Sequence, residues 1–254
     1  MKFSGMKLRF VFGLFFLLLI PEVFSQGLTG DEFTFVRVKY TSGGNNYRYR
    51  NPFGTNWPSW TVDYPSAEQN FMEGLRKWTG MNITEPVALS LLDDEIYRYP
   101  FAYAVEVGFM TLSPKEAAGL AEWLLRGGFL MVDDFHGPFE WQHFVDQIDM
   151  VFPERSILDI PIDHPLFHCF YDFHELMQIP GLGTILNGMT YEKGGVQQHC
   201  RGIFDDDGRL MVLIIHNMDM GDAFEHAKDP RYPPRYSVEA FKLGINFVIY
   251  ALTH

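Results

Sequence analysis

The chain has 254 residues, of which 47% are hydrophobic and 20% are charged, a composition typical of a globular protein long enough for one full α/β domain. Its formal net charge of −12 argues against nucleic acid as a partner and against docking on an anionic membrane surface, because both need clustered basic residues. Clustered carboxylates, by contrast, leave room for a divalent cation.

The first 25 residues have the pattern of a signal peptide. Three basic residues stand within the first nine positions, and residues 10–20 are apolar but too short to cross a bilayer comfortably. Val23 and Ser25 supply the branched and small side chains that precede a cleavage site. We predict cleavage after Ser25 and export to the periplasm or the medium. The alternative is that the segment is retained as an anchor. The sequence suggests contact with a membrane only through such an uncleaved segment.

Strand and helix patterns alternate along the rest of the chain, residues 26–254, and this part of the sequence has no linker or repeat. We therefore predict a single α/β domain with its core at 33–253. The alternation predicts a mostly parallel sheet with an antiparallel edge hairpin, and the loop at 41–65 could cover one rim of this sheet. The predicted elements are strand 33–40, helix 66–79, strands 86–92 and 99–106, helix 113–126, strand 129–132, helix 138–151, strand 155–160, hairpin 201–204 with 209–215, and helix 238–252.

Two of these helices begin with the same sequence signal. Ser66 with Gln69, and Ser113 with Glu116, have the spacing of a capping box. Pro114 adds a proline at the first helical position of the second helix. We predict that both serines cap their helices.

The segment 127–136 organises the fold and the candidate site. Two glycines end a helix, four apolar residues follow without polar alternation, and two carboxylates and an imidazole come next. Such a run predicts a strand buried on both faces in the middle of a parallel sheet, and ligands gather beyond the carboxyl ends of such strands. Three predicted strand ends carry polar groups that would share one rim, and the candidate pocket is Asp93, Asp94, Asp133, Asp134, His136, His216, Asn217, Asp219 and Asp222.

Three interpretations of this rim remain open. A divalent metal could be held by Asp133, Asp134, His136 and His216, whose carboxylates and imidazoles are suitable ligands. One of the two adjacent aspartates could instead act as a general base beside His136. In the third, the carboxylates only cap helices and bind loop amides. No cofactor is established by the sequence, and the partner is an unknown small molecule or protein.

The cysteines and the known catalytic motifs constrain the chemistry. Cys169 and Cys200 could form a disulfide in an oxidising compartment, or remain two buried thiols. The Asp triplet at 205–207 lacks the spacing of an EF-hand and indicates a tight turn before Gly208. The sequence has no Gly-x-Ser-x-Gly, Gly-x-Gly-x-x-Gly or P-loop motif, so it gives no support to an acyl-transfer or nucleotide site.

A set of short motifs over about residues 33–254 resembles an exported bacterial family called domain of unknown function 4159. The motifs lie at 35–40, 63–65, 99–101, 127–134, 163–165, 202–203, 208–210 and 216–222. The resemblance implies a flavodoxin-like three-layer sandwich similar to class I glutamine amidotransferases, and it implies no established activity. Those enzymes use a cysteine at a strand–helix elbow, which this sequence lacks, so their activity is not carried over.

The sequence therefore leaves two hypotheses for function. The first is a non-catalytic ligand-binding or interaction module that has an enzyme-like fold without the nucleophile. The second is a metal-assisted or carboxylate-based hydrolase that uses Asp133, Asp134 and His136.

Overall fold

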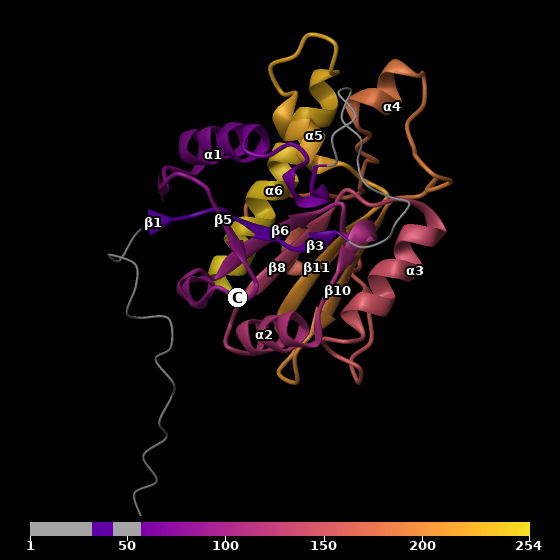
Figure 1. Cartoon of the computed structure of the whole chain (residues 1–254). Helices are drawn as coiled ribbons and strands as arrows, with labels where there is room; N and C mark the ends of the chain where they lie inside the picture. Colours follow the sequence, from indigo (N-terminus) through magenta and orange to yellow (C-terminus); the bar gives the residue numbers. More distant parts are fainter. Residues whose placement is uncertain (1–31, 43–56) are drawn as a thin grey trace, which may run out of the picture.

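A computed structural model of the chain describes residues 32–42 and 57–254, and a seven-stranded sheet runs through its middle (Figure 1). The first five strands in sheet order are parallel, β10 is antiparallel to β11, and β9 is antiparallel to β10. In sheet order the strands are β5 (Val87–Ser90), β2 (Val36–Lys39), β6 (Phe101–Val105), β8 (Phe129–Asp133), β11 (Leu210–His216), β10 (His199–Phe204) and β9 (Leu158–Asp159). The predicted mostly parallel sheet with an antiparallel edge is confirmed.

Two short strand pairs lie outside this sheet. β1 (Glu32–Phe33) pairs in parallel with β4 (Asn82–Ile83). β3 (Thr41–Ser42) pairs in antiparallel with β7 (Met110–Thr111). Residues 43–56, which make up most of the predicted loop 41–65, lie outside the described residues.

Helices cover both faces of the sheet (Figure 1). Side chains of α1, α5 and α6 share a core with one face, and those of α2 and α3 share a second core with the other. The helices are α1 (Ser66–Thr79), α2 (Pro114–Leu125), α3 (Gly137–Ile148), α4 (Leu182–Leu186), α5 (Met220–Glu225) and α6 (Pro234–Thr253), with the 3-10 turns η1 (Ser59–Thr61), η2 (Asp94–Arg98), η3 (Val107–Phe109) and η4 (Pro165–Phe167). Among the described residues, no helix combines the length and the apolar character needed to span a membrane.

Strand β8 is the central buried strand that its apolar run predicts. It lies between β6 and β11 in the sheet. Phe129 and Met131 belong to one core, and Leu130 and Val132 belong to the other. Because successive side chains of a strand point to opposite faces, a strand covered on both faces needs apolar residues at every position.

The two predicted capping boxes have different outcomes. The Ser113 hydroxyl accepts from the Glu116 amide at 3.2 Å, and the Glu116 carboxylate accepts from the Ser113 amide at 2.8 Å. The prediction for Ser66 is wrong, because Pro65 is the capping residue of α1 and no side chain caps its first turn. The carbonyl of Asp63 accepts from the Ala67 amide at 2.9 Å instead.

An ion pair inside the fold joins the sheet to α1. The guanidinium of Arg37 on β2 is fully buried, and its Nε donates to the Glu68 carboxylate at 2.6 Å. Its Nη1 donates to the carbonyls of Trp60 and Val62 at 3.1 and 2.9 Å. A buried charge is costly unless it is paired and hydrogen-bonded in this way. The arrangement fixes the segment before α1, which carries Asp63, against the end of the sheet.

Candidate functional site

Three neighbouring strands of the sheet end in the same way. The residues directly after β6, β8 and β11 are Glu106, Asp134 and Asn217, and their φ angles are +51°, +53° and +65°. Left-handed backbone is uncommon for residues other than glycine, although aspartate and asparagine tolerate it best. It turns each chain sharply at the carboxyl edge of the sheet, where the polar side chains gather.

Backbone strain in the described structure is concentrated at this edge. Besides the three strand ends, the non-glycine residues with positive φ among those described are Asp63 at +61° and Lys193 at +48°. Asp63 lies in electrostatic contact with Asp134, and Lys193 with Glu106. Each such residue costs on the order of 1–3 kcal/mol, and strain of this kind persists where the surroundings hold it in place, often at functional sites.

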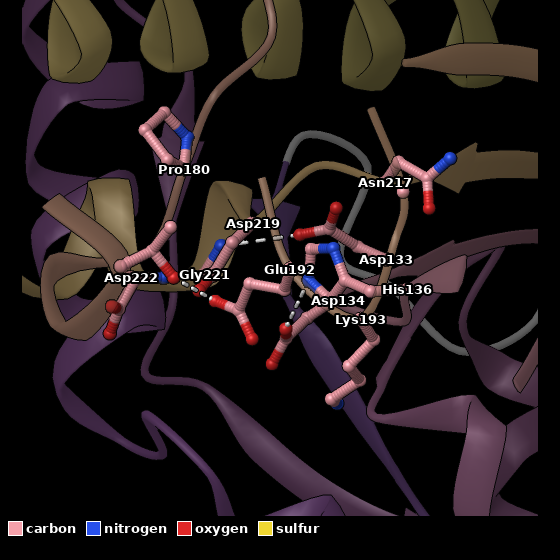
Figure 2. Close-up of polar contacts among 12 residues, drawn as sticks. Asp133, Asp134, His136, Pro180, Glu192, Lys193, Asn217, Asp219, Gly221 and Asp222 are labelled. Carbon is pink, nitrogen blue, oxygen red and sulfur yellow. Dashed lines mark hydrogen bonds and ion pairs between the residues drawn. The ribbon is translucent and has the colours of Figure 1, made fainter. Parts of the chain in front are cut away.

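We use the name acidic centre for the carboxylates that meet at this edge: Asp63, Glu106, Asp133, Asp134, Asp219 and Asp222. Asp133 and Asp134 come from the end of β8, and Asp219 and Asp222 begin α5. Figure 2 shows the labelled members, Asp133, Asp134, Asp219 and Asp222, on these two elements, with His136 beside Asp134.

Asp133 is fully buried beneath the first turn of α5. Its Oδ2 accepts hydrogen bonds from the Tyr103 hydroxyl at 2.8 Å and from the amides of Met220 and Gly221 at 2.8 and 3.2 Å. Its Oδ1 is buried and has no hydrogen-bond partner among the residues that the structure describes. Burial, helped by the charge of Asp134, raises the pKa of the Asp133 carboxyl to about 7, although these hydrogen bonds lower it.

Asp134 and His136 form a carboxylate–imidazole pair. The Nε2 of His136 lies 3.2 Å from the Asp134 Oδ1, and both residues are buried. Burial lowers the pKa of His136, but the hydrogen bond and charge of Asp134 outweigh it, so the pKa is raised overall. The Nδ1 of His136 is buried and finds no hydrogen-bond partner within residues 32–42 and 57–254. The pair therefore offers a ring nitrogen that could bind or move a proton.

Asp63, Asp219 and Asp222 bring carboxylate oxygens together within the acidic centre. One ligand atom from each lies within 4.8 Å of those from the other two. Asp219 caps α5, with its Oδ1 accepting from the Asp222 amide at 2.8 Å, and the Asp222 Oδ2 accepts from the Leu182 amide at 2.5 Å. The Oδ2 of Asp63 is buried, and no described residue forms a hydrogen bond with it.

The electrostatics of the acidic centre are dominated by burial and mutual repulsion. Burial raises the pKa of Asp63, Glu106 and Asp219 well above the usual range, and neighbouring carboxylates raise each further. Lys193 lowers the pKa of Glu106, and its own ammonium pairs with Glu140 at 2.7 Å. Arg37, the buried cation nearest Asp63, is paired with Glu68. The acidic centre thus holds more carboxylates than the cations beside it can neutralise.

Not all of the predicted pocket residues join the acidic centre. Asp93 and Asp94 are exposed beyond β5, which β2 and β6 separate from β8. Asp93 accepts from the Ser90 amide at 2.8 Å, so it closes a local turn. Asn217 lies beside the acidic centre as a structural group, since its Oδ1 accepts from the Gly137 amide at 2.8 Å.

His216 is packed among rings and does not face the carboxylates as a ligand. Its ring lies 4.9 Å from those of Phe135 and Trp141, between centroids, and its Nε2 is 3.3 Å from the Gly137 carbonyl. Burial lowers the pKa of His216 to about 4.

The metal-binding geometry differs from the predicted quartet of Asp133, Asp134, His136 and His216. Across residues 32–42 and 57–254, the groups of three or more side chains with converging ligand atoms are Asp63 with Asp219 and Asp222, and Asp222 with Glu225 and His226. The quartet is not among them, because one oxygen of Asp133 serves the start of α5 and His216 lies in the ring stack.

Asp63 and Glu106 belong to the acidic centre but were not among the residues predicted from the sequence. Glu106 ends a predicted strand, so it carried the same positional signal as Asp133. Asp63 stands in a long loop, and no local pattern indicates that this loop returns to the sheet edge. The two cysteines, Cys169 and Cys200, are both free in the structure. The Cys169 thiol lies 3.2 Å from the Asn246 carbonyl, and burial raises the pKa of Cys200.

Fold and site together define an α/β protein with a mostly parallel sheet and an acidic centre at its carboxyl edge. A family model described as domain of unknown function (DUF4159) matches residues 34–252, and the chain belongs to this family. The family expected from the motifs is thereby confirmed. No curated protein matches the chain.

Proposed function

We propose that the protein is an exported, non-catalytic binding module that takes a cationic ligand in the acidic centre. The observation that carries the proposal is that three buried carboxylate oxygens of this centre have no hydrogen-bond partner among residues 32–42 and 57–254: Asp63 Oδ2, Glu106 Oε2 and Asp133 Oδ1. Buried acceptors are almost always satisfied, and leaving one unpaired costs about 1–3 kcal/mol. A bound cation would compensate several of them at once.

The fold supports a binding module related to enzymes. Numbered along the chain, the five parallel strands lie in the order 2-1-3-4-5, which is the flavodoxin-like order, with ligands expected beyond the carboxyl ends. We propose on this ground the flavodoxin-like, amidotransferase-like architecture that the motifs imply. The turn after β8 carries Asp134 and neither cysteine, since Cys200 lies in β10 and Cys169 follows η4. The absence of a cysteine nucleophile there favours binding over acyl transfer.

Export is part of the proposal and rests on the N-terminal sequence. The basic start, the apolar run and the small residue at Ser25 are those of a cleavable signal. A periplasmic or extracellular module meets divalent cations and small organic amines. Such ligands suit a site that is rich in carboxylates.

A hydrolase remains the second candidate, and one observation favours it. The Nδ1 of His136 is buried and unpartnered while Nε2 pairs with Asp134, which is the arrangement of a general base. For a hydrolase, His136→Gln abolishes turnover of p-nitrophenyl acetate or p-nitrophenyl phosphate and leaves the melting temperature within a few degrees of wild type. For a binding module, the wild type has no turnover above buffer.

The binding proposal is tested by ligand-dependent thermal stability. The full chain is melted in buffers of equal ionic strength that contain NaCl alone, CaCl2, MgCl2, MnCl2 or spermidine trihydrochloride. A cationic ligand present at 100 times its dissociation constant stabilises the fold by about 2.7 kcal/mol, which appears as a higher melting temperature. We expect this rise with at least one of these four cations, and a smaller rise in Glu106→Gln than in the exposed control Asp94→Asn. No rise with any of the four cations overturns the proposal.

A further inference from the structure

We propose that Asp63, Asp219 and Asp222 bind one divalent cation of the hard, oxygen-preferring type, such as Ca²⁺, Mg²⁺ or Mn²⁺. The inference rests on the proposed function and names its ligand and its coordinating residues. One oxygen from each aspartate lies within 4.8 Å of those from the other two. Oxygens about 2.1–2.6 Å from a shared ion are separated by distances of this size. Three carboxylates and no sulfur or imidazole favour a hard cation over zinc.

The three aspartates come from two separate segments that the fold brings together. Asp63 precedes α1, whereas Asp219 and Asp222 lie in the cap and first turn of α5. One oxygen of Asp219 and one of Asp222 are held by backbone amides, those of Asp222 and Leu182. Hydrogen bonds of this kind orient metal-binding carboxylates. An ion here would tie the segment before α1 to the start of α5.

Unpartnered buried oxygens provide a second, independent observation. Among the described residues, the buried Oδ2 of Asp63 has no hydrogen-bond partner. It faces the first turn of α5, because a Cβ on Gly221 would collide with it. Asp133, fully buried, binds the same turn through Oδ2, and its Oδ1 likewise has no partner within the described part of the chain. Both carboxylates thus contact the turn of α5 in which Asp222 lies, and a bound cation would compensate their charge.

Two glycines make room for this arrangement. A Cβ on Gly181 would lie 2.5 Å from the Oδ2 of Asp219 and 3.0 Å from the Oδ2 of Asp222. A Cβ on Gly221 would also meet the Tyr103 hydroxyl at 3.3 Å. Glycine at these two positions therefore leaves the space that the carboxylate oxygens of Asp63, Asp219 and Asp222 occupy.

A second group of side chains shares Asp222 and is the competing site. Asp222, Glu225 and His226 also bring ligand atoms within 4.8 Å of one another. All three are partly exposed, and the Nε2 of His226 already lies 3.3 Å from the Asp222 Oδ1. A local ion pair accounts for this group, so we assign the cation to the more buried set.

The experiment measures the binding of single metal salts to the full chain after dialysis against EDTA and then metal-free buffer. Isothermal titration with CaCl2, MgCl2 and MnCl2 is combined with the electron paramagnetic resonance signal of free Mn²⁺, which falls as the ion binds. We expect one ion per chain for at least one salt. Asp222→Asn and Asp63→Asn should each weaken binding at least tenfold. The asparagine oxygen at 222 can still accept from Leu182, and the Asp63 Oδ2 has no partner to lose, so both variants should fold.

Two controls distinguish this site from nonspecific attraction to surface acids and from the competing group. Asp94→Asn removes an exposed acid beyond β5, and His226→Gln removes a ligand of the competing group, so both should bind as wild type does. If His226→Gln weakens metal binding as much as Asp222→Asn does, the assignment is overturned. The same holds if Asp94→Asn weakens metal binding as much as Asp222→Asn does. If spermidine binds and none of the three metals does, this inference fails and the binding module stands. If neither spermidine nor any metal binds, both fail.

Discussion

At the scale of the residue, Asp133 shows how a buried carboxylate supports the fold. Its Oδ2 accepts three hydrogen bonds, from Tyr103 and from two amides of α5. Asp133→Ala leaves these donors unpaired, and we expect the free energy of unfolding at pH 7 to fall by about 2–4 kcal/mol. Asp133→Asn keeps an acceptor oxygen in place, so its loss should be below about 1 kcal/mol. Urea unfolding followed by circular dichroism measures both.

The comparison between the two Asp133 variants decides the role of the charge. Equal losses for alanine and asparagine would mean that the negative charge, and not the acceptor geometry, stabilises the start of α5. That outcome would contradict the raised pKa of Asp133, which shows that burial disfavours the ionised form.

His216 predicts a dependence of stability on pH. Burial lowers its pKa from 6.5 to about 4 in the folded protein, so the unfolded chain binds the proton more tightly between these values. The stability linked to this histidine is therefore complete above about pH 6.5 and is lost as the pH falls toward 4. We expect the loss to be about 2 kcal/mol, and His216→Gln to remove it. Urea unfolding at pH 7.5, 6, 5 and 4 gives the two profiles, and parallel profiles would refute the assignment.

At the scale of the element, Ser66 and Ser113 provide a matched pair for testing helix capping. Each is followed three residues later by a glutamine or a glutamate. Ser113 caps α2 through both hydrogen bonds of a capping box, whereas Ser66 lies inside α1 and caps nothing. We expect Ser113→Ala to lower the free energy of unfolding by about 1 kcal/mol. Ser66→Ala should change it by a few tenths at most, because alanine is the better helix former. Similar losses in both variants would show that the first serine caps α1 in solution.

The sequence predicts well those elements in which the buried apolar residues recur at one regular spacing. Strand β8 and helix α2 lie where their apolar patterns and caps place them. The hairpin turns at Gly208, whose φ is +84°, and the Asp205 carboxylate accepts from the amides of Asp207 and Arg209. Helix α5 was missed because six residues cannot show a helical period, and its cap, Asp219, was interpreted as a pocket residue.

The candidate site was predicted only in part, because a local pattern does not show which segments meet in the fold. Asp133, Asp134, His136, Asp219 and Asp222 do meet at the carboxyl edge. Asp93 and Asp94 do not, because the order of strands in a sheet depends on long-range packing and not on local pattern. Asp63 could not be found, since the loop that contains it returns to the edge through the burial of Arg37.

At the scale of the whole molecule, an acidic chain has to remain folded with six carboxyl groups gathered at one edge of its sheet. The formal charge is −12 and the sequence pI about 5.1. The basic residues Lys2, Lys7 and Arg9 would oppose this charge only as long as the predicted signal peptide is attached.

The last prediction concerns this N-terminal segment. Expressed with its own N-terminus in a Gram-negative host, the chain should accumulate outside the cytoplasm with a mass that corresponds to residues 26–254. Leu17→Arg places a charge within the apolar run, which the export machinery accepts only if it stays hydrophobic. The variant should remain in the cytoplasm at the full-length mass, and intact-mass spectrometry of the cell fractions measures both. An exported protein that retains residues 1–25 would mean that the segment is an anchor. The acidic centre would then work at a membrane surface.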